Sequence, residues 1–187
     1  MLVGVSGSIA VVNLISYLTI FRDRLTREIK VIMTDAAASM LPPSTVALFC
    51  DGVFLDKRSS PERRPGHVDL ARWCDLFVVL PATANVLGLT AHGVAPNLLT
   101  NAVLASPRPV VFCPNMNDVM WRKKVVQRNI ELLREEGHVV VEPILASAYE
   151  ATSGETRRSW VLPDPNQLVD HLREAHSHLR SLDSSAE

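Results

Sequence analysis

The chain has 187 residues, of which 47% are hydrophobic and 21% are charged, so it can bury a core without disulfide or metal staples. Nineteen basic and twenty acidic residues leave a formal charge of −1, which gives no indication of nucleic acid or anionic membrane as a partner. Cys50, Cys74 and Cys113 are widely spaced in apolar surroundings, so we expect reduced thiols in a cytoplasmic protein and no metal site. We expect no signal peptide, and no apolar run approaches the roughly 20 residues of a membrane span.

The first predicted unit is a short apolar strand over residues 2–5, followed by the turn Ser6-Gly7-Ser8 and a helix over 9–22. Unpaired N–H groups and the helix dipole converge at such a turn, which suits an anion. The sequence lacks the G-x-G-x-x-G fingerprint of dinucleotide sites, so a purely structural turn is an equal alternative.

The second predicted strand, 28–33, ends at Thr34-Asp35, and a helical stretch interrupted by two prolines follows to residue 50. Thr34 suits a phosphate and Asp35 a ribose, or either residue only caps the helix. Residues 51–66 are expected to form a long, charged loop whose basic residues face solvent or attract a carboxylate. His67 opens the next helical turn, either as a surface residue or as a group for proton transfer near neutral pH.

Two further strand ends carry small and amide-rich turns. The strand 76–80 leads into PATANV at 81–86, where Ala82 and Ala84 allow a planar ligand to approach and Thr83 and Asn85 can bind its polar edge.

The strand 109–113 leads into PNMNDVMW at 114–121, which opens a helix reaching about residue 136. Asn115 and Asn117 are both placed to cap this helix, but one cap needs only one amide. The segment therefore either contacts a ligand or contributes apolar side chains to the core.

The remaining segments complete an alternating pattern. A last strand at 138–142 precedes an irregular stretch, 143–160, which we expect to fold over the ligand edge as a flap. A terminal helix at 166–180 and a frayed tail at 181–187 follow, so residues 1–180 form one domain. Strands that alternate with helices predict an α/β, Rossmann-like (flavodoxin-like), doubly wound and mostly parallel sheet of five to six strands with helices on both faces. The carboxyl ends of parallel strands share one edge, so we expect the three turns to meet there.

The PATANV and PNMNDVMW motifs, with His67 upstream, resemble the homo-oligomeric flavin-containing cysteine decarboxylases, which carry a PASANT-like pattern and then P-x-MN-x-x-MW. The resemblance covers most of the chain and extends to LFCD at 48–51, APNLLT at 95–100 and a Ser-Gly in the flap. The chain departs from the pattern at Thr83 for serine, at Val86 for threonine and at Glu155, where a basic residue is common.

The resemblance implies a role for each matching residue. The ribityl phosphate of FMN would be held by Gly7, Ser8, Ile9 and Thr34, and the isoalloxazine would be lined by Ala82, Thr83, Ala84 and Asn85. His67 would transfer a proton, Asn117 would hold the substrate carboxylate, and Met120 would pack at the reacting centre. The substrate flap would carry Tyr149, Ser153 and Gly154. FMN would sit between the subunits of a trimer, itself able to assemble into a dodecamer, with His67 supplied by a neighbouring subunit.

Two enzymatic branches of this family and one non-enzymatic relative remain as alternatives. The favoured branch oxidatively decarboxylates the carboxy-terminal cysteine of a ribosomally made precursor peptide to an enethiol, on the route to lanthipeptide or thioamitide rings. The second branch, phosphopantothenoylcysteine decarboxylase of coenzyme A biosynthesis, reduces the enethiol with a flap cysteine, which residues 143–160 lack. The third is a flavin-bound regulatory subunit with a long acidic tail, for which the carboxy-terminal residues here are too weakly acidic.

Overall fold

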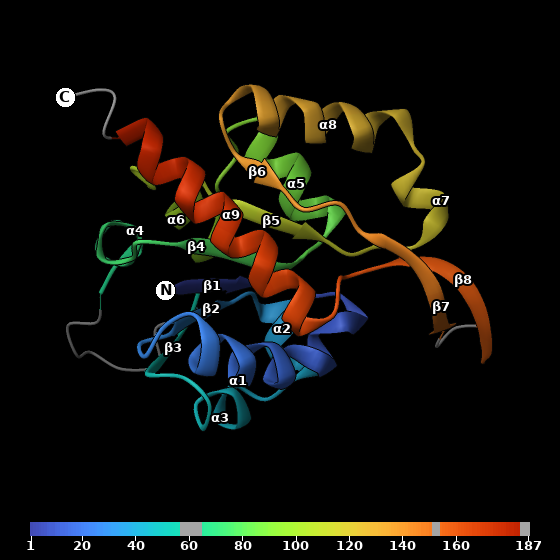
Figure 1. The fold of residues 1–187 in the computed structure, drawn as a ribbon, viewed down its shortest axis with the longest axis horizontal. Helices are drawn as coiled ribbons and strands as arrows, with labels where there is room; N and C mark the ends of the chain where they lie inside the picture. The colour runs from blue at the N-terminus through green and yellow to red at the C-terminus, as the bar shows by residue number, and fades with distance from the viewer. Residues whose placement is uncertain (57–64, 151–153, 184–187) are drawn as a thin grey trace.

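The computed structural model describes residues 1–56, 65–150 and 154–183 (Figure 1). Its centre is a six-stranded parallel sheet in the order β3-β2-β1-β4-β5-β6, which is the order of a Rossmann sheet. The strands are β1 (Leu2–Val5), β2 (Lys30–Met33), β3 (Gly52–Leu55), β4 (Phe77–Ala82), β5 (Val111–Pro114) and β6 (Val139–Val140). The predicted doubly wound α/β fold is confirmed, and the sheet has six strands, the larger of the two expected numbers.

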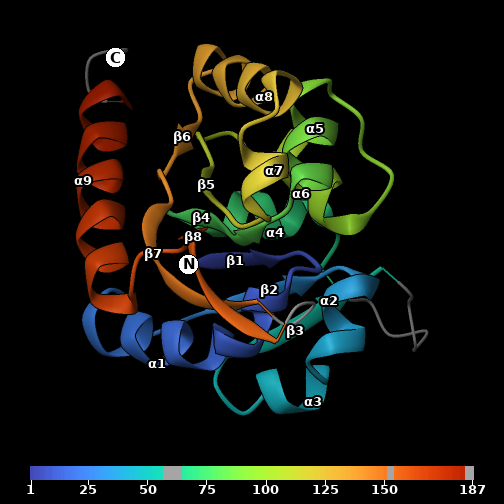
Figure 2. The same cartoon turned by 90° about the vertical axis from the view of Figure 1, so that its right-hand side faces the viewer.

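Helices cover both faces of the sheet (Figure 2). One face carries α1 (Leu14–Arg24), α2 (Asp35–Met40), α3 (Pro43–Val46) and α9 (Pro165–Asp183). The other face carries α4 (His67–Trp73), α5 (Ala84–Ala91), α6 (Leu98–Leu104), α7 (Asp118–Trp121) and α8 (Lys124–Glu135). Successive strand residues alternate between the two cores, as in β1, where Leu2 joins the α4–α8 side and Val3 the α1–α9 side.

The structure corrects the expected type or bounds of several elements. The segment 51–66 is predicted to form a charged loop, but Gly52–Leu55 forms the edge strand β3 beside β2, and residues 57–64 lie outside the described residues. The helix expected over 9–22 begins as a 3₁₀ helix, η1 (Ile9–Asn13), before α1. The long helix expected after PNMN is divided into α7 and α8, with Lys123 in extended conformation between them.

The stretch expected to be irregular is an antiparallel hairpin of β7 (Ile144–Glu150) and β8 (Glu155–Val161). It stands beyond the carboxyl edge of the main sheet in both views (Figures 1 and 2). Gly154, with φ of 71°, precedes β8 in the left-handed region that favours glycine. The terminal helix α9 ends at Asp183, three residues beyond its expected end.

Across the described ranges, no helix combines the length and apolar character needed to cross a bilayer.

Candidate functional site

The main pocket lies at the point where the order of the sheet reverses. Strand β1 has β2 on one side and β4 on the other, and chain connections lead away from this pair in opposite directions. Ligands of such sheets bind in the crevice outside these carboxyl ends. The pocket has a volume of about 540 Å³, within the range of small-molecule and cofactor sites. Its lining comprises Ser6, Gly7, Ser8, Thr34, Asp35, Ala36, Asp56, Thr83, Ala84, Asn85, Val86, Asn97, Asn115, Met116 and Met120.

Ser6 joins the turns that follow β1 and β4. Its side chain is buried, and its Oγ donates a hydrogen bond of 2.7 Å to the carbonyl of Pro81. The same Oγ accepts a hydrogen bond of 2.9 Å from the N–H of Thr83. This buried hydroxyl therefore fixes the ends of β1 and β4 relative to each other. It also links the PATANV motif to the first turn.

Three helices begin at the pocket, each with a hydroxyl as its N-cap. The Oγ of Ser8 caps η1, and the Oγ1 atoms of Thr34 and Thr83 cap α2 and α5, each accepting a backbone N–H at 3.3–3.4 Å. The first N–H groups of a helix lack intrahelical partners and carry partial positive charge. Their convergence offers several donors to one anion, which is what a phosphate group requires.

The turn at Gly7 is closely packed against α2. A Cβ added at Gly7 would lie 2.5 Å from the Cβ of Ala36, far inside ordinary contact distance. Gly7 has no positive φ, so space and not backbone conformation requires glycine here. Glycine therefore lets the first turn approach α2 closely at a position that lines the pocket.

The two asparagines of PNMN have different functions in the structure. The Oδ1 of Asn117 accepts the N–H of Met120 at 2.8 Å, so Asn117 is the N-cap of α7. Asn115 lies in the pocket, where its Oδ1 accepts a hydrogen bond from the Ser8 hydroxyl and its N–H donates to Ala82 at 2.9 Å. Asn117 is exposed next to Met120, which lines the pocket and is 41% exposed.

His67 lies outside the main pocket of its own chain. It is the exposed first residue of α4 and lines a second cavity of about 250 Å³. The two cavities share Asp56 and Asn97. Asp56 accepts a hydrogen bond from the N–H of Leu98, and Asn97 caps α6, so these two residues form the wall between the cavities.

The structure therefore collects most, but not all, of the residues expected at the site. Gly7, Ser8, Thr34, Thr83, Ala84, Asn85 and Met120 line the main pocket. Ile9 does not line it and is exposed, and Ala82 is fully buried in β4. Tyr149 and Gly154 belong to the hairpin, whereas Ser153 is outside the described residues.

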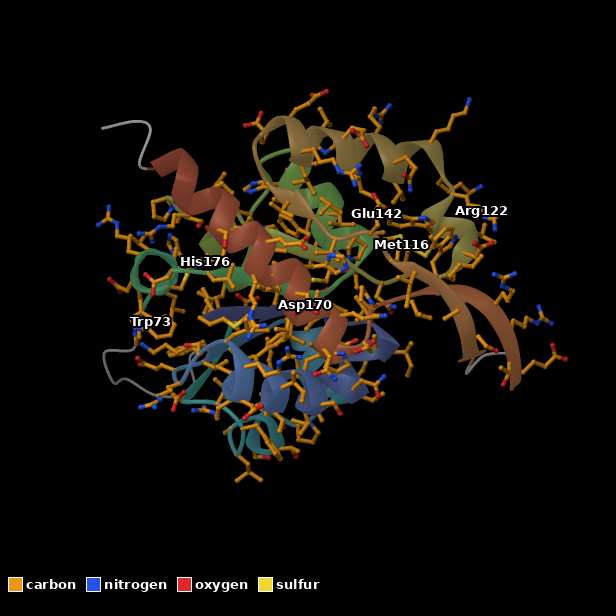
Figure 3. All side chains as sticks on the ribbon, in the orientation of Figure 1. Trp73, Met116, Arg122, Glu142, Asp170 and His176 are labelled. Carbon is orange, nitrogen blue, oxygen red and sulfur yellow. The ribbon has the colours of Figure 1, made fainter. Side chains whose placement is uncertain are left out.

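Five further pocket residues lie in turns or motifs noted in the sequence without being assigned to the site: Ser6, Asp35, Val86, Asn97 and Asn115. Asp56 also lines the pocket, but the sequence does not indicate this because the preceding strand β3 was not predicted. Met116 lies near α7 at the hairpin end of the molecule (Figure 3), and its position in PNMN was the available signal.

The hairpin is held to the site by aromatic packing. The rings of Trp121 in α7 and Trp160 in β8 have centroids 6.2 Å apart, and Met116 is partly buried in the same core cluster. The hairpin and the PNMN segment are therefore mechanically connected.

None of the three cysteines has the properties of a reactive thiolate. Burial raises the pKa of Cys113, which is fully buried, and burial also raises the pKa values of Cys74 and Cys50. No group of three or more potential metal ligands occurs within the part of the chain that the structure describes.

The donor set of the pocket fits an elongated ligand that has an anionic end and a planar ring. The hydroxyls and N–H groups around Gly7, Ser8 and Thr34 suit the anion. Asp35 also lines the pocket, and a carboxylate there suits hydrogen bonds from the hydroxyl groups of a sugar-like chain. Ala84, Asn85 and the two methionines offer small, amide and polarizable surfaces to a ring.

Comparisons with known proteins agree with this geometry. The family model described as Flavoprotein matches residues 1–175. Mersacidin decarboxylase of Bacillus sp. (strain HIL-Y85/54728) is 45% identical over 171 residues, which cover 90% of this chain and 87% of the relative. The bifunctional coenzyme A biosynthesis protein CoaBC of Bacillus subtilis (strain 168) is 40% identical over 143 residues, which are 74% of this chain but only 34% of CoaBC.

Two solved structures have the same fold. MrsD from Bacillus sp. HIL-Y85/54728 has a TM-score of 0.82 at 41% identity, with 94% of each chain covered. A His-to-Asn variant of EpiD in complex with the substrate peptide DSYTC has a TM-score of 0.84 at 25% identity, with 91% of this chain and 96% of EpiD covered. The match of nearly the whole chain, together with the pocket at the sheet's reversal point, establishes that the chain belongs to the flavoprotein family.

Proposed function

We propose that this chain is an FMN-dependent peptidyl-cysteine decarboxylase, which converts the carboxy-terminal cysteine of a ribosomally made precursor peptide into an enethiol. The observation that carries the proposal is the pocket where three capped helix starts meet the PNMN segment. Its relation to mersacidin decarboxylase, 45% identical over most of both chains, supports the reaction class. The EpiD structure contains a peptide that ends in cysteine, which supports the substrate class.

The chemistry requires an electron sink, because a carboxylate β to a thiol has no group to accept the electrons released with carbon dioxide. FMN supplies the two-electron oxidation of the cysteine thiol to a thioaldehyde, which is such a sink. After carbon dioxide leaves, the peptide carries an enethiolate, and two electrons and two protons have been removed from it.

The residues at the end of β1 are proposed to hold the phosphate. Gly7 lets the first turn pack closely on α2 beside the proposed phosphate position, and the hydroxyl of Thr34 supplies a donor. Ser8 lines the same part of the pocket, but its hydroxyl already donates to Asn115. Thr83, Ala84 and Asn85 are proposed to hold the ring at the start of α5. Neither Ile9 nor Ala82 lines the pocket of the isolated chain. We therefore propose that these two residues help to position the neighbouring turns and do not contact FMN through their side chains.

Asn117 and Met120 are proposed to position the cysteine. The Oδ1 of Asn117 is engaged as the cap of α7, which leaves its Nδ2 group to donate to the carboxylate of the substrate. Met120 packs on the reacting carbon atoms from the pocket wall. An apolar wall around the carboxylate favours its loss as neutral carbon dioxide.

His67 is proposed as the group that moves the proton of the substrate thiol. Because it lies in the neighbouring cavity of its own chain, we propose that a second subunit supplies it to the pocket. This requires a homo-oligomer, and we propose a trimer that can assemble further into a dodecamer, as the family resemblance implies. The precursor peptide is made in the cytoplasm, where we expect the enzyme to act.

The reaction is proposed to stop at the enethiol. Reduction of the enethiol in the same site would need a proton donor such as a cysteine, and the sequence from 143 to 160 has none. This separates the chain from a phosphopantothenoylcysteine decarboxylase, the activity that the similarity to CoaBC would favour.

Two measurements test the proposal. Denatured protein should release FMN at about one molecule per chain, and the native protein should decarboxylate a cysteine-terminated peptide in preference to phosphopantothenoylcysteine. A protein that cannot be loaded with FMN refutes the cofactor, and a preference for phosphopantothenoylcysteine favours the coenzyme A branch.

A further inference from the structure

The two faces of the hairpin differ in charge. Side chains alternate between faces along each strand, and directly paired residues share a face. The register pairs Leu145 with Trp160 and Ser147 with Arg158, so these four residues occupy one face, together with Thr156. The opposite face carries Glu155 and Arg157. Arg158 is thus the only charged residue that the register assigns to the Trp160 face of β7 and β8.

The two arginines of β8 are in different electrostatic states. Arg157 is paired with Glu155 through two hydrogen bonds of 2.6 and 2.9 Å, so its charge is already compensated. Arg158 is exposed and has neither an acidic partner nor a hydrogen-bond acceptor within the described ranges. An exposed, uncompensated guanidinium is available to an external carboxylate.

Arg158 lies on the face of the hairpin that is attached to the site. Trp160, two residues away on the same face, packs against Trp121 of α7 at 6.2 Å. The hairpin passes beside α7 in Figure 1 and lies in front of the carboxyl ends of the sheet in Figure 2. The Trp160 face is therefore the face that packs against α7, the helix that also carries the pocket residue Met120.

We propose that Arg158 determines specificity by binding an acidic side chain of the precursor peptide, upstream of its terminal cysteine. This inference rests on the proposed function, which places the cysteine beside Met120 and leaves the preceding residues to pass along α7 and the hairpin. An extended peptide spans about 3.3 Å per residue, so residues a few positions upstream reach the hairpin.

The α-carboxylate of the cysteine is not a suitable partner for Arg158. That group becomes neutral carbon dioxide, and a guanidinium would stabilise the charged ground state more than the transition state. A carboxylate in an upstream side chain keeps its charge throughout the reaction. Its pairing with Arg158 raises affinity without opposing the chemistry.

The experiment uses peptides of identical length that end in cysteine and carry glutamate, glutamine or lysine at each of the five preceding positions in turn. We measure kcat/KM by mass spectrometry with the FMN-loaded protein. At one or two adjacent positions, glutamate should exceed glutamine by about fivefold or more, mostly through KM, and the preference should weaken with added salt.

Two variants assign the preference to a residue. Arg158→Gln should abolish the glutamate preference, and Arg158→Glu should shift it to lysine at the same position. The matched control is Arg157→Gln, which removes the paired arginine of the opposite face and should retain the glutamate preference.

The outcomes separate this inference from the proposed function. If wild-type protein converts all peptides equally, or if Arg158→Gln keeps the preference, Arg158 is not a specificity residue although the decarboxylase assignment stands. If no cysteine-terminated peptide is converted, the proposed function itself fails.

Discussion

Replacing Gly7 by alanine tests whether the first turn is shaped for a ligand. The new Cβ would lie 2.5 Å from the Cβ of Ala36 and 3.1–3.3 Å from backbone atoms of the same residue. Ordinary contacts begin near 3.4 Å, so the turn and α2 must separate by roughly 1 Å.

The expected cost follows from overpacking. Forcing an extra carbon into a close-packed site typically costs about 1–3 kcal/mol, and each 1.4 kcal/mol is about a tenfold change in an equilibrium constant. Because the strain falls on two turns that we propose to hold the phosphate, we expect Gly7→Ala to weaken FMN binding by about ten- to a hundredfold. Stability without FMN should fall by about 1–3 kcal/mol.

A second substitution provides the control. Ala36→Gly removes the atom at 2.5 Å but leaves the backbone contacts, so the double variant should recover part of the lost affinity. FMN titration by fluorescence and urea unfolding measure the two quantities. The reasoning is refuted if Gly7→Ala binds FMN and unfolds like the wild type, or if Ala36→Gly worsens the defect.

Three further predictions concern catalysis, a buried hydrogen bond and pH. His67→Asn and Asn117→Asp should each lower the rate of peptide decarboxylation by about 10²–10⁴-fold while the fold persists, as circular dichroism will show. Tyr17→Phe should destabilise the protein by about 1–2 kcal/mol in urea unfolding, because the buried Tyr17 hydroxyl donates to the carbonyl of Pro163 at 2.7 Å. Burial lowers the pKa of His138 below its ordinary 6.5, against the opposing effect of a nearby glutamate, so stability from the neutral ring should be present above pH 6.5 and lost as the pH falls below it.

Controls and contrary outcomes follow from the same chain. His92 is exposed at the C-terminal end of α5, so His92→Asn should not change the decarboxylation rate. The exposed hydroxyl of Thr19 in α1 also donates to a carbonyl, yet Thr19→Ala should change stability by no more than about 0.5 kcal/mol. Near-wild-type decarboxylation by the two site variants would show that His67 is a surface residue without a catalytic role and that Asn117 only caps α7. For His138, a His138→Gln variant with unchanged acid sensitivity would contradict the assignment.

The parts of the fold that the sequence predicts correctly are those in which local chemistry and burial agree. Leu2–Val5 is fully buried on both faces, as expected for an apolar run in the middle of a parallel sheet. Thr34 is an N-cap, which is one of the two roles that its position predicts, and it also lines the pocket. Thr83 lines the pocket as expected and is in addition an N-cap, a role that the sequence does not assign to it.

The missed elements lie at edges, where burial is weak. The strand Gly52–Leu55 is only half-buried, begins directly after an aspartate and is followed by charged residues. Its short apolar run was therefore interpreted as part of the loop. The hairpin strands β7 and β8 pair only with each other and lie outside the main sheet, and β8 is largely exposed. His67 lines the second cavity and not the main pocket, a placement that depends on tertiary packing and that no local sequence pattern encodes.

The mass of the product tests the central claim most directly. The FMN-loaded protein is given a cysteine-terminated peptide with and without oxygen, and the peptide and flavin are both measured. We predict loss of carbon dioxide together with two hydrogens, with one turnover per flavin and bleaching of its colour when oxygen is absent. Loss of carbon dioxide alone, with turnover unaffected by the removal of oxygen, would contradict oxidative decarboxylation that ends at the enethiol.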